Sequence, residues 1–375
     1  MRLLHLHSSF NPGGKELRAA KLIGAFGAQV RHTIVSGVPG AMGAAGAIDP
    51  AMKVDYPQDF PPLSGPVSLA RLRAVAEAMR GHDLVLTYNW GAMDAVMAHR
   101  LYARRLGLPP LVHHEDGFNQ DEAEGLKPAR NLFRRLALPT AAALVVPSQT
   151  LERIALDIWK QPRGRVRRVP NGIALADFAR PPRLDAVPGL VKQPGDLWIG
   201  TLAGLRAVKN LPALVEAFRA VPEPWKLVIV GEGPERAAIA GRAAELGLSD
   251  RVFLPGHAPD PAAVMPLFDL FALSSDSEQF PISVVEAMAA GIAVASTDVG
   301  DVAAMLSDAN RPLVDGVRDA GALGQVLERL AADPALRAAI GQANKARAEA
   351  EYGEAAMVAA YRAIYGGALG RQSFP

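Results

Sequence analysis

The feature that most constrains the fold of this chain is an alternation of short apolar runs with longer amphipathic stretches. It occurs twice along the 375 residues. Apolar runs of about four to eight residues are typical of buried strands, and apolar residues at helical spacing are typical of helices. Strands that alternate with helices favour parallel sheets. The sequence therefore predicts an α/β fold of two Rossmann-like, doubly wound parallel-sheet domains that face each other across a cleft.

The first copy of the pattern defines an N-terminal domain at 1–180. Its strands are expected at 2–7, 30–36, 83–88, 110–114, 142–148 and 167–171, and its helices include 15–26, 67–80, 92–106 and 127–138. The segment 179–196 is rich in proline and lacks periodicity, so we assign 181–196 to a linker. Strands and helices alternate again in a second domain at 197–353. Residues 354–375 are expected to form a helix that packs back on the first domain.

Charge is distributed unevenly between the two halves. Residues 1–180 contain 23 lysines and arginines against 15 acidic residues, whereas residues 181–375 contain 17 against 23. A basic half is consistent with a solvated face, or with a face that meets anionic lipid or a phosphorylated acceptor. Nucleic acid is not expected as a partner, because no aromatic residues interleave with the basic clusters.

The composition of the chain also bears on the cellular compartment in which we expect the protein. The chain has no cysteine, which rules out disulfides and thiolate chemistry. No run of about 18 apolar residues occurs, so no membrane-spanning helix is predicted. The N-terminal residues lack the features of a signal peptide. We therefore expect a cytoplasmic protein, with peripheral contact at the inner face of the cell membrane as the sharper hypothesis.

Two carboxylates in the segment 274–301 suggest a binding site. Pro281 marks the start of a helix, so Glu278 precedes that helix and Glu286 lies inside it on a largely apolar background. A charged group in such a place is costly unless it is hydrogen-bonded, and its sequence neighbours offer no obvious partner. A ligand rich in hydroxyls would serve. The alternative is a capping glutamate followed by one that reaches solvent.

Glycines and cations occur where parallel strands are expected to end. Gly13 and Gly14 follow the first strand, and Gly231 and Gly233 follow a strand in the second half. Backbone N–H groups without a neighbouring Cβ can approach an anion closely, although ordinary turns would use the same residues. Arg206 and Lys209 follow another strand, where they suit a developing negative charge or lie in a solvated turn.

A polar run follows the strand at 110–114. His113 and His114 are adjacent, so their side chains are expected on opposite faces of the strand and are unlikely partners for one metal ion. No Asp-x-Asp motif is present either. We expect no metal and no cofactor. A structural role for the histidines stays open.

Eight segments resemble family 4 glycosyltransferases, a group of retaining enzymes with the GT-B fold. They occur in the family's order at 11–16 (NPGGKE), 113–118 (HHEDGF), 145–150 (VVPSQT), 169–173 (VPNGI), 204–218, 227–235, 252–260 and 274–300. The resemblance implies a nucleotide diphosphate sugar (UDP or GDP) as donor substrate. It implies no metal, and it makes the first domain the acceptor side and the second the donor side.

The resemblance also implies residue roles. His114, Arg206, Lys209 and Glu278 would act at the reacting centre, with Glu278 on the donor sugar and the two cations on the leaving diphosphate. Glu286 would hold the ribose. The donor diphosphate would meet Gly13, Gly14 and the helix start at Phe280, Pro281, Ile282 and Ser283, and Gly231 and Gly233 would line the nucleotide pocket. Asp116 and His113 would lie on the acceptor side.

Two of the positions that depart from the family pattern lie at the proposed donor site. The usual arginine five residues before Lys209 is Gly204, so Arg206 would have to replace it. The residue after Glu278 is Gln279 instead of the common glycine, which bears on the identity of the donor sugar.

The predicted activity is transfer of a sugar to an acceptor hydroxyl with retention of configuration, in the synthesis of a cell-surface polysaccharide or lipid-linked glycan. A nucleotide-sugar epimerase of related architecture and a non-catalytic nucleotide-sugar binding protein are the alternatives. The segment 125–138 places Lys127, Arg130, Arg134 and Arg135 beside apolar residues. We expect it to rest on an anionic membrane and to help reach a lipid-linked acceptor.

Overall fold

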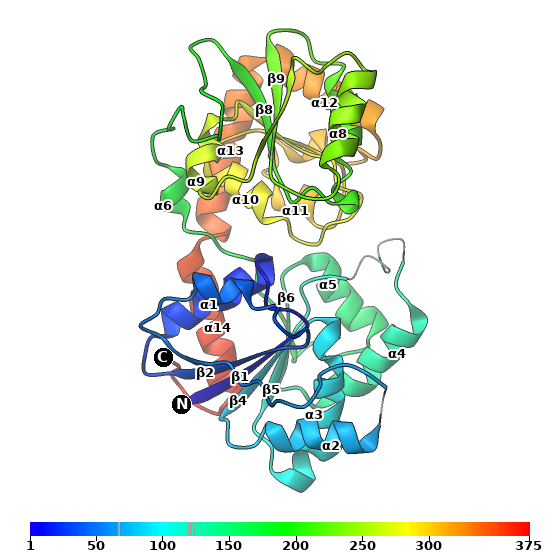
Figure 1. The fold of residues 1–375 in the computed structure, drawn as a ribbon, viewed down its shortest axis with the longest axis vertical. Coiled ribbons are helices and arrows are strands. Elements are labelled where there is room, and N and C mark those ends of the chain that lie inside the picture. The colour runs from blue at the N-terminus through cyan, green and yellow to red at the C-terminus, as the bar shows by residue number, and fades with distance from the viewer. Residues whose placement is uncertain (67, 119–121, 123–124) are drawn as a thin grey trace. The chain divides into compact units, whose positions relative to one another are not determined.

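The computed structural model describes residues 1–66, 68–118, 122 and 125–375. The chain forms two compact units (Figure 1). Unit 1 consists of Met1–Asn171 together with Ala355–Pro375, and unit 2 consists of Gly172–Glu354. Of the helix predicted at 67–80, residue 67 lies outside the described residues.

Unit 1 contains a seven-stranded parallel sheet in the order β3-β2-β1-β4-β5-β6-β7. Its strands are β1 (Arg2–His7), β2 (Arg31–Ser36), β3 (Lys53–Asp55), β4 (Leu84–Tyr88), β5 (Leu111–His114), β6 (Ala143–Val146) and β7 (Val166–Arg168). Its helices include α1 (Gly14–Phe26), α2 (Leu69–Ala78), α3 (Met93–Leu106), α4 (Pro128–Ala137), α5 (Gln149–Arg153) and α14 (Glu354–Ala368).

Alternate residues of the strands in unit 1 enter two separate cores, as the period of a strand requires. Leu4 and Leu6 of β1 pack with α2, α3 and α5 on one face of the sheet. Leu3 packs with α1 and α14 on the other face. The last segment of the chain therefore covers the sheet formed by the first.

Unit 2 contains a five-stranded parallel sheet in the order β10-β9-β8-β11-β12. Its strands are β8 (Leu197–Leu202), β9 (Trp225–Val230), β10 (Val252–Gly256), β11 (Leu270–Leu273) and β12 (Val294–Ser296). Its helices are α6 (Leu175–Phe178), α7 (Leu211–Phe218), α8 (Arg236–Glu245), α9 (Pro261–Val264), α10 (Ile282–Ala289), α11 (Val302–Met305), α12 (Ala320–Ala332) and α13 (Pro334–Glu351).

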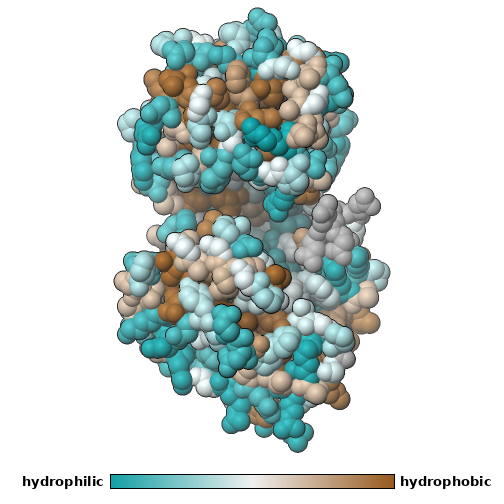
Figure 2. Space-filling view, in the orientation of Figure 1, coloured by the Kyte–Doolittle hydropathy of each residue, from teal (hydrophilic) through white to brown (hydrophobic). Residues whose placement is uncertain are grey.

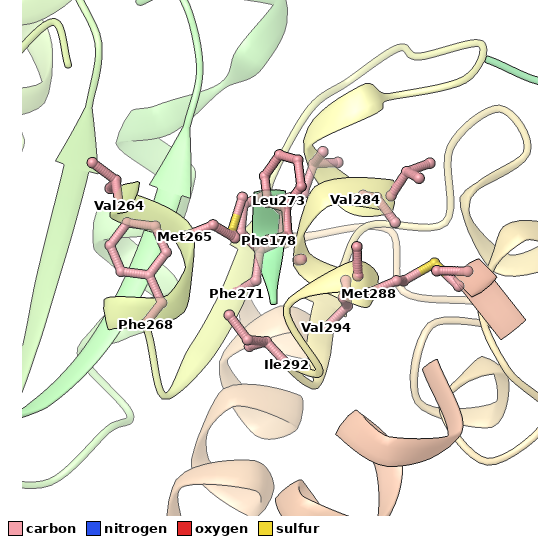
Figure 3. Close-up of a cluster of buried hydrophobic side chains, with 14 of the residues drawn as sticks. Phe178, Val264, Met265, Phe268, Phe271, Leu273, Val284, Met288, Ile292 and Val294 are labelled. Carbon is pink, nitrogen blue, oxygen red and sulfur yellow. The ribbon is translucent and has the colours of Figure 1, made fainter. Parts of the chain in front are cut away.

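The two faces of this second sheet are also covered by different helices. Residues of α7, α8 and α12 pack on one face, and residues of α6, α9 and α10 pack on the other. Figure 3 shows part of the second core, in which Phe268, Phe271 and Met288 lie among aliphatic side chains. The face drawn in Figure 2 carries hydrophilic residues interspersed with smaller apolar areas on both units. No helix in the described part of the chain is long and apolar enough to cross a membrane.

The boundaries of the units differ from those expected from the sequence. The chain leaves unit 1 after Asn171 instead of after 180, and the segment 181–196 belongs to unit 2 rather than linking two domains. Val187 is buried in the core beside α10. Lys192 donates to the Leu267 carbonyl at 2.6 Å and to Asp269 at 2.7 Å. The prolines of this segment interrupt helical and strand periodicity, but its Val187 still packs in the core of unit 2.

The chain passes from unit 1 to unit 2 at Asn171–Gly172, and Ile173, just beyond this point, is hydrogen-bonded to the last residues of unit 2. The N–H of Ile173 donates to the Tyr352 carbonyl at 3.0 Å, and the N–H of Glu354 donates to the Ile173 carbonyl at 3.0 Å. A Cβ on Gly172 would lie 2.7 Å from the Gly353 carbonyl oxygen. The close packing of the two backbone segments thus requires glycine at 172.

Candidate functional site

Loops at the carboxyl ends of β8 and β11, neighbouring strands in the sheet, bring Lys209 and Glu278 together. Lys209 Nζ forms an ion pair with Glu278 Oε1, and both side chains are largely buried. Ser275 donates its hydroxyl to the same carboxylate oxygen at 2.8 Å. Both bonds converge on Oε1, so Oε2 of Glu278 can accept a hydrogen bond from a ligand.

Helix α10 begins beside this pair. Pro281 is its N-cap residue and Ile282 its first residue, so the free N–H groups of its first turn include those of Ile282 and Ser283. The Phe280 ring packs edge-on against Tyr352, with ring centroids 5.6 Å apart. Pro281 is buried and Ser283 is half-buried. The structure therefore places the predicted helix start next to Glu278.

Glu286 lies further along α10 and is half-buried. It makes an interaction within the chain, which corrects the expectation that it lacks a partner. Its role on the ribose stays a prediction.

Gly231 and Gly233 have a packing role. Both have positive φ values, 148° and 158°. A Cβ on Gly231 would lie 1.9 Å from the Ala203 carbonyl oxygen, and one on Gly233 would lie 2.4 Å from that of Leu205. The N–H of Gly231 donates to the Gly256 carbonyl at 2.9 Å, so it does not serve an anion as expected. These glycines let the loop that carries Lys209 pack tightly against its neighbour.

Arg206 lies on the same loop and is exposed. A Cβ built on Gly204 would lie 3.6 Å from Arg206 Nε. The Arg206 side chain therefore passes over the space that a side chain at 204 would enter. This geometry is compatible with the expected replacement.

The glycines of unit 1 lie at the start of α1. Gly13 is its extended N-cap residue, with no side-chain cap of its own, and Gly14 is the first helical residue. A Cβ on Gly13 would lie 2.7 Å from Glu16 Oε2. Glu16 is buried and pairs with Lys15. The helix N-terminus therefore already has a carboxylate of this chain beside it, and a diphosphate contact at Gly13 and Gly14 stays a prediction.

His114 has the buried, hydrogen-bonded environment of a structural histidine. It is fully buried, with Nδ1 3.1 Å from the Thr87 carbonyl and Nε2 2.9 Å from the Tyr365 hydroxyl. Burial lowers its pKa to about 3. Both ring nitrogens therefore have partners within unit 1. Its contact with the donor sugar stays a prediction.

His113 is also buried and points to another partner, as adjacent strand residues should. Its Nδ1 lies 2.8 Å from the Thr87 hydroxyl, and its Nε2 lies 3.7 Å from Glu115 Oε2. No group of three or more potential metal-ligating side chains occurs within the described ranges.

Asp116, expected on the acceptor side, is held by Arg18 of α1. Arg18 donates Nη2 to Asp116 Oδ2 at 2.8 Å and Nη1 to the other oxygen, and Nη1 also donates to Asn171 Oδ1 at 2.8 Å. Burial by itself would raise the pKa of Asp116, but the charge and hydrogen bonds of Arg18 outweigh it and hold that pKa below its usual value. Asp116 is thus an ionised anchor of the loop after β5.

Glu115, the residue before Asp116, is held by an arginine of another helix. Arg134 of α4 donates Nε to Glu115 Oε2 at 2.9 Å, and both side chains are fully buried. Its guanidinium carbon lies 4.9 Å from the ring centroids of Trp90 and Trp159. A second carboxylate, Glu122, lies 3.6 Å from Arg134 Nη1. Because cation–π contacts are strongest where water is excluded, the contacts of buried Arg134 with the two tryptophans stabilise this network.

This network removes Arg134 from the expected membrane face at 125–138, which otherwise stays a prediction. Arg130 also turns toward Glu122, donating at 2.8 Å, so two of the four predicted cations face carboxylates of the protein. The exposed side of α4 instead carries Arg135 with Leu132 and Leu136, which are 57% and 56% exposed.

Several residues of this arrangement were not identified from the sequence. Ser275 carried one usable signal, since it lies three residues before Glu278 in the same loop. The local sequence gave no sign of the other contacts, because Arg18 lies 98 residues from Asp116 and 153 from Asn171, and Glu115 lies 19 from Arg134.

Comparison with known proteins covers both units. Residues 187–347 match the family described as glycosyl transferases group 1, and residues 13–172 match the glycosyl transferase 4-like domain. The chain is 26% identical to a 2-deoxystreptamine glucosyltransferase of Streptomyces kanamyceticus, over 68% of this chain and 69% of that protein. It is 29% identical to a D-inositol 3-phosphate glycosyltransferase of Nocardia farcinica, over 67% and 59%.

Solved structures show the same fold. Anabaena HepE, crystallised with UDP, is 19% identical and has a TM-score of 0.79, with 98% of this chain and 99% of that chain covered. A sucrose-phosphate synthase from Thermosynechococcus elongatus is 21% identical, with a TM-score of 0.75 and the same coverage. Two parallel-sheet α/β units of this kind constitute the GT-B fold. The chain is a glycosyltransferase and belongs to family 4 of these enzymes.

Proposed function

We propose that this enzyme transfers a sugar from a nucleotide diphosphate sugar to an acceptor hydroxyl, with retention of configuration. The observation that carries the proposal is the Lys209–Glu278 pair beside the start of α10. It joins a cation, a carboxylate and free backbone N–H groups at one edge of one sheet. These groups match the leaving phosphate, the sugar hydroxyls and the diphosphate, respectively.

In this reaction the acceptor oxygen forms a bond to the anomeric carbon on the face from which the diphosphate leaves. The bond between that carbon and the phosphate oxygen breaks, and the departing oxygen takes the acceptor proton. Lys209 and Arg206 stabilise the charge that builds on the leaving group. Glu278 orients the sugar through a hydroxyl, and Glu286 holds the ribose. No metal is required in this scheme.

The nucleotide is UDP or GDP, and the product is a cell-surface or lipid-linked glycan. Support for a uridine nucleotide comes from HepE, whose structures contain UDP and UDP-glucose. Support for glycan synthesis comes from relatives such as the lipopolysaccharide core mannosyltransferase of Rhizobium leguminosarum.

A thermal-shift panel of UDP, GDP, ADP and their sugars tests the donor assignment. A ligand at about 100 times its Kd stabilises the fold that binds it by ~2.7 kcal/mol. For a unit of this size we expect a rise in Tm of about 5–10 °C with one nucleotide. No shift with any nucleotide would contradict the proposal. Turnover of the donor without an acceptor, to an epimeric sugar, would favour the epimerase alternative.

We further propose that the exposed side of α4 and the neighbouring α3 contacts an anionic membrane surface. Arg135, Leu132 and Leu136 lie on α4, and Arg100, Leu101, Arg104 and Arg105 are exposed on α3, which packs against it. Basic residues beside exposed leucines suit anionic headgroups and the acyl boundary. This surface would bring the enzyme to a lipid-linked acceptor.

Liposome flotation tests this surface. We expect greater recovery with anionic than with neutral vesicles, because each basic residue near an anionic surface contributes about 1 kcal/mol. Arg135→Glu should reduce binding to anionic vesicles by roughly tenfold. Arg183→Glu, on an exposed arginine of unit 2, is the matched control and should change little. Equal recovery with both vesicle types would refute the proposal.

A further inference from the structure

Unit 2 contains a cavity of about 180 Å³ that the proposed donor site does not use. It lies beyond the carboxyl ends of β11 and β12, between the first turns of α7 and α12. Its volume suits a small organic molecule better than a single water. Ser275 lines it and also bonds Glu278, so the cavity adjoins the Lys209–Glu278 pair. The lining residues are Asn210, Ala213, Ser274, Ser275, Asp276, Thr297, Val299, Val317, Arg318, Asp319, Ala320 and Leu323.

The three hydroxyl groups that line the cavity can act only as hydrogen-bond acceptors toward a ligand. Ser274 donates to the Lys209 carbonyl at 2.9 Å, Ser275 donates to Glu278 at 2.8 Å, and Thr297 donates to the Ser275 carbonyl at 2.7 Å. A hydroxyl has one proton and two lone pairs. Because all three protons are used within the protein, these oxygens can only accept from a ligand. A ligand that fits them must itself be rich in donors.

The charges at the mouth favour the same kind of ligand. Asp276 and Asp319 are exposed carboxylates that line the cavity. The one lining guanidinium, Arg318, is already paired with Asp298 at 2.9 Å. Asp319 also caps α12 by accepting from the Ala322 N–H at 2.8 Å, which reduces the attraction of that helix end for anions. An anionic ligand would meet net negative charge here.

Apolar residues complete the lining on the other sides. Leu323 and Val317 are buried, and Val299, Ala213 and Ala320 are half-buried. Polar edges with an apolar surface between them match a pyranose ring, which carries hydroxyls at its rim and C–H groups on its faces.

We propose that this cavity is a second saccharide site, which takes a neutral or amino-bearing pyranose and excludes anionic sugars. The choice of a saccharide among donor-rich ligands rests on the proposed function, whereas the preference for donors over anions rests on the lining alone. Through Ser275 an occupant would contact the loop that holds Glu278. The site would therefore accommodate a further sugar unit of a glycan close to the transfer centre.

Binding of glucose, glucosamine and glucuronate to the full chain, measured by NMR titration, tests this proposal. We expect glucosamine to bind about fivefold more tightly than glucose, because its ammonium group adds attraction of about 1 kcal/mol to a nearby carboxylate. Glucuronate should not bind. Asp276→Asn should reduce the preference for glucosamine, and Ala320→Leu, which fills the cavity, should abolish binding of both sugars.

Two controls separate this site from the donor site. Asp185→Asn, on an exposed aspartate elsewhere in unit 2, should leave all three affinities unchanged. The Ala320→Leu chain should keep the thermal shift with nucleotide, which shows that it is folded and that its donor site is intact. Sugar binding that survives Ala320→Leu, equal binding of glucuronate, or no binding of any sugar would overturn the inference. Sugar binding without any nucleotide shift would instead contradict the proposed function alone.

Discussion

Replacement of Arg134 by methionine is expected to destabilise unit 1 by about 3–5 kcal/mol, the usual cost of removing one partner of a buried ion pair. The variant leaves Glu115, which is fully buried, without its charged partner at 2.9 Å. It also removes a cation that lies 4.9 Å from the ring centroids of Trp90 and Trp159. Methionine keeps much of the volume of the arginine side chain, so the loss of stability reflects the missing charge more than poorer packing.

Urea denaturation followed by tryptophan fluorescence measures this effect, since Trp90 and Trp159 lie in unit 1 beside the substituted residue. The matched control is Arg135→Met, the exposed neighbour on the same helix, which should change the free energy of unfolding by less than about 0.5 kcal/mol. Adding Glu115→Gln to the Arg134 variant should recover part of the loss, because it removes the uncompensated charge. A loss below about 1 kcal/mol for Arg134→Met would show that the network contributes little.

Replacement of Lys209 by alanine is expected to lower turnover by about 10²–10³-fold, the range found when one charge-stabilising donor is removed from an active site. In our proposal Lys209 acts on the diphosphate as it leaves, so its contribution is greatest in the transition state. The loss should therefore appear in kcat, with a smaller change in the donor KM. Release of nucleoside diphosphate, from the donor that raises Tm most, provides the assay.

The complementary variant is Glu286→Ala, which should chiefly raise the donor KM. A charge-assisted hydrogen bond contributes roughly 1.5–3 kcal/mol, so we expect an increase of about 10- to 150-fold. Lys226→Ala is the matched control, since Lys226 also pairs with a carboxylate of unit 2, Asp196, at 2.7 Å. Kinetics that are unchanged in both the Lys209 and the Glu286 variants would refute the assignment of the donor site.

The sequence was sufficient for the second sheet and for six of the seven strands of the first, all but β3, and it assigned one reacting centre to Lys209 and Glu278. These residues are 69 positions apart, yet each follows a strand whose apolar run is unambiguous. Residues that follow neighbouring parallel strands meet at one edge of a sheet. Topology therefore places both residues at the same edge of the sheet, but their ion pair was not predicted from the sequence.

Helix α4 shows why the rest could not be predicted. Its leucines at 132 and 136 are exposed, whereas Arg134, which was expected on the same membrane-facing side, is buried. The carboxylates that make this possible, Glu115 and Glu122, lie outside the helix. The burial of His114 against Tyr365 could not be predicted for a similar reason, because the two residues are 251 positions apart. Periodicity within a helix or strand does not reveal a remote polar partner.

Unit 1 is discontinuous along the chain, and this affects the order in which the protein can fold as it is synthesised. Unit 2 is one continuous segment, so it can fold before the residues that complete unit 1 have been made. Until Tyr361 and Tyr365 emerge, the face of the first sheet that α1 and α14 share is only partly covered, and His114 lacks the hydroxyl that it meets in the finished protein. Domains generally fold as units during synthesis. Unit 1 can therefore complete its fold only after residues 355–375 have been synthesised.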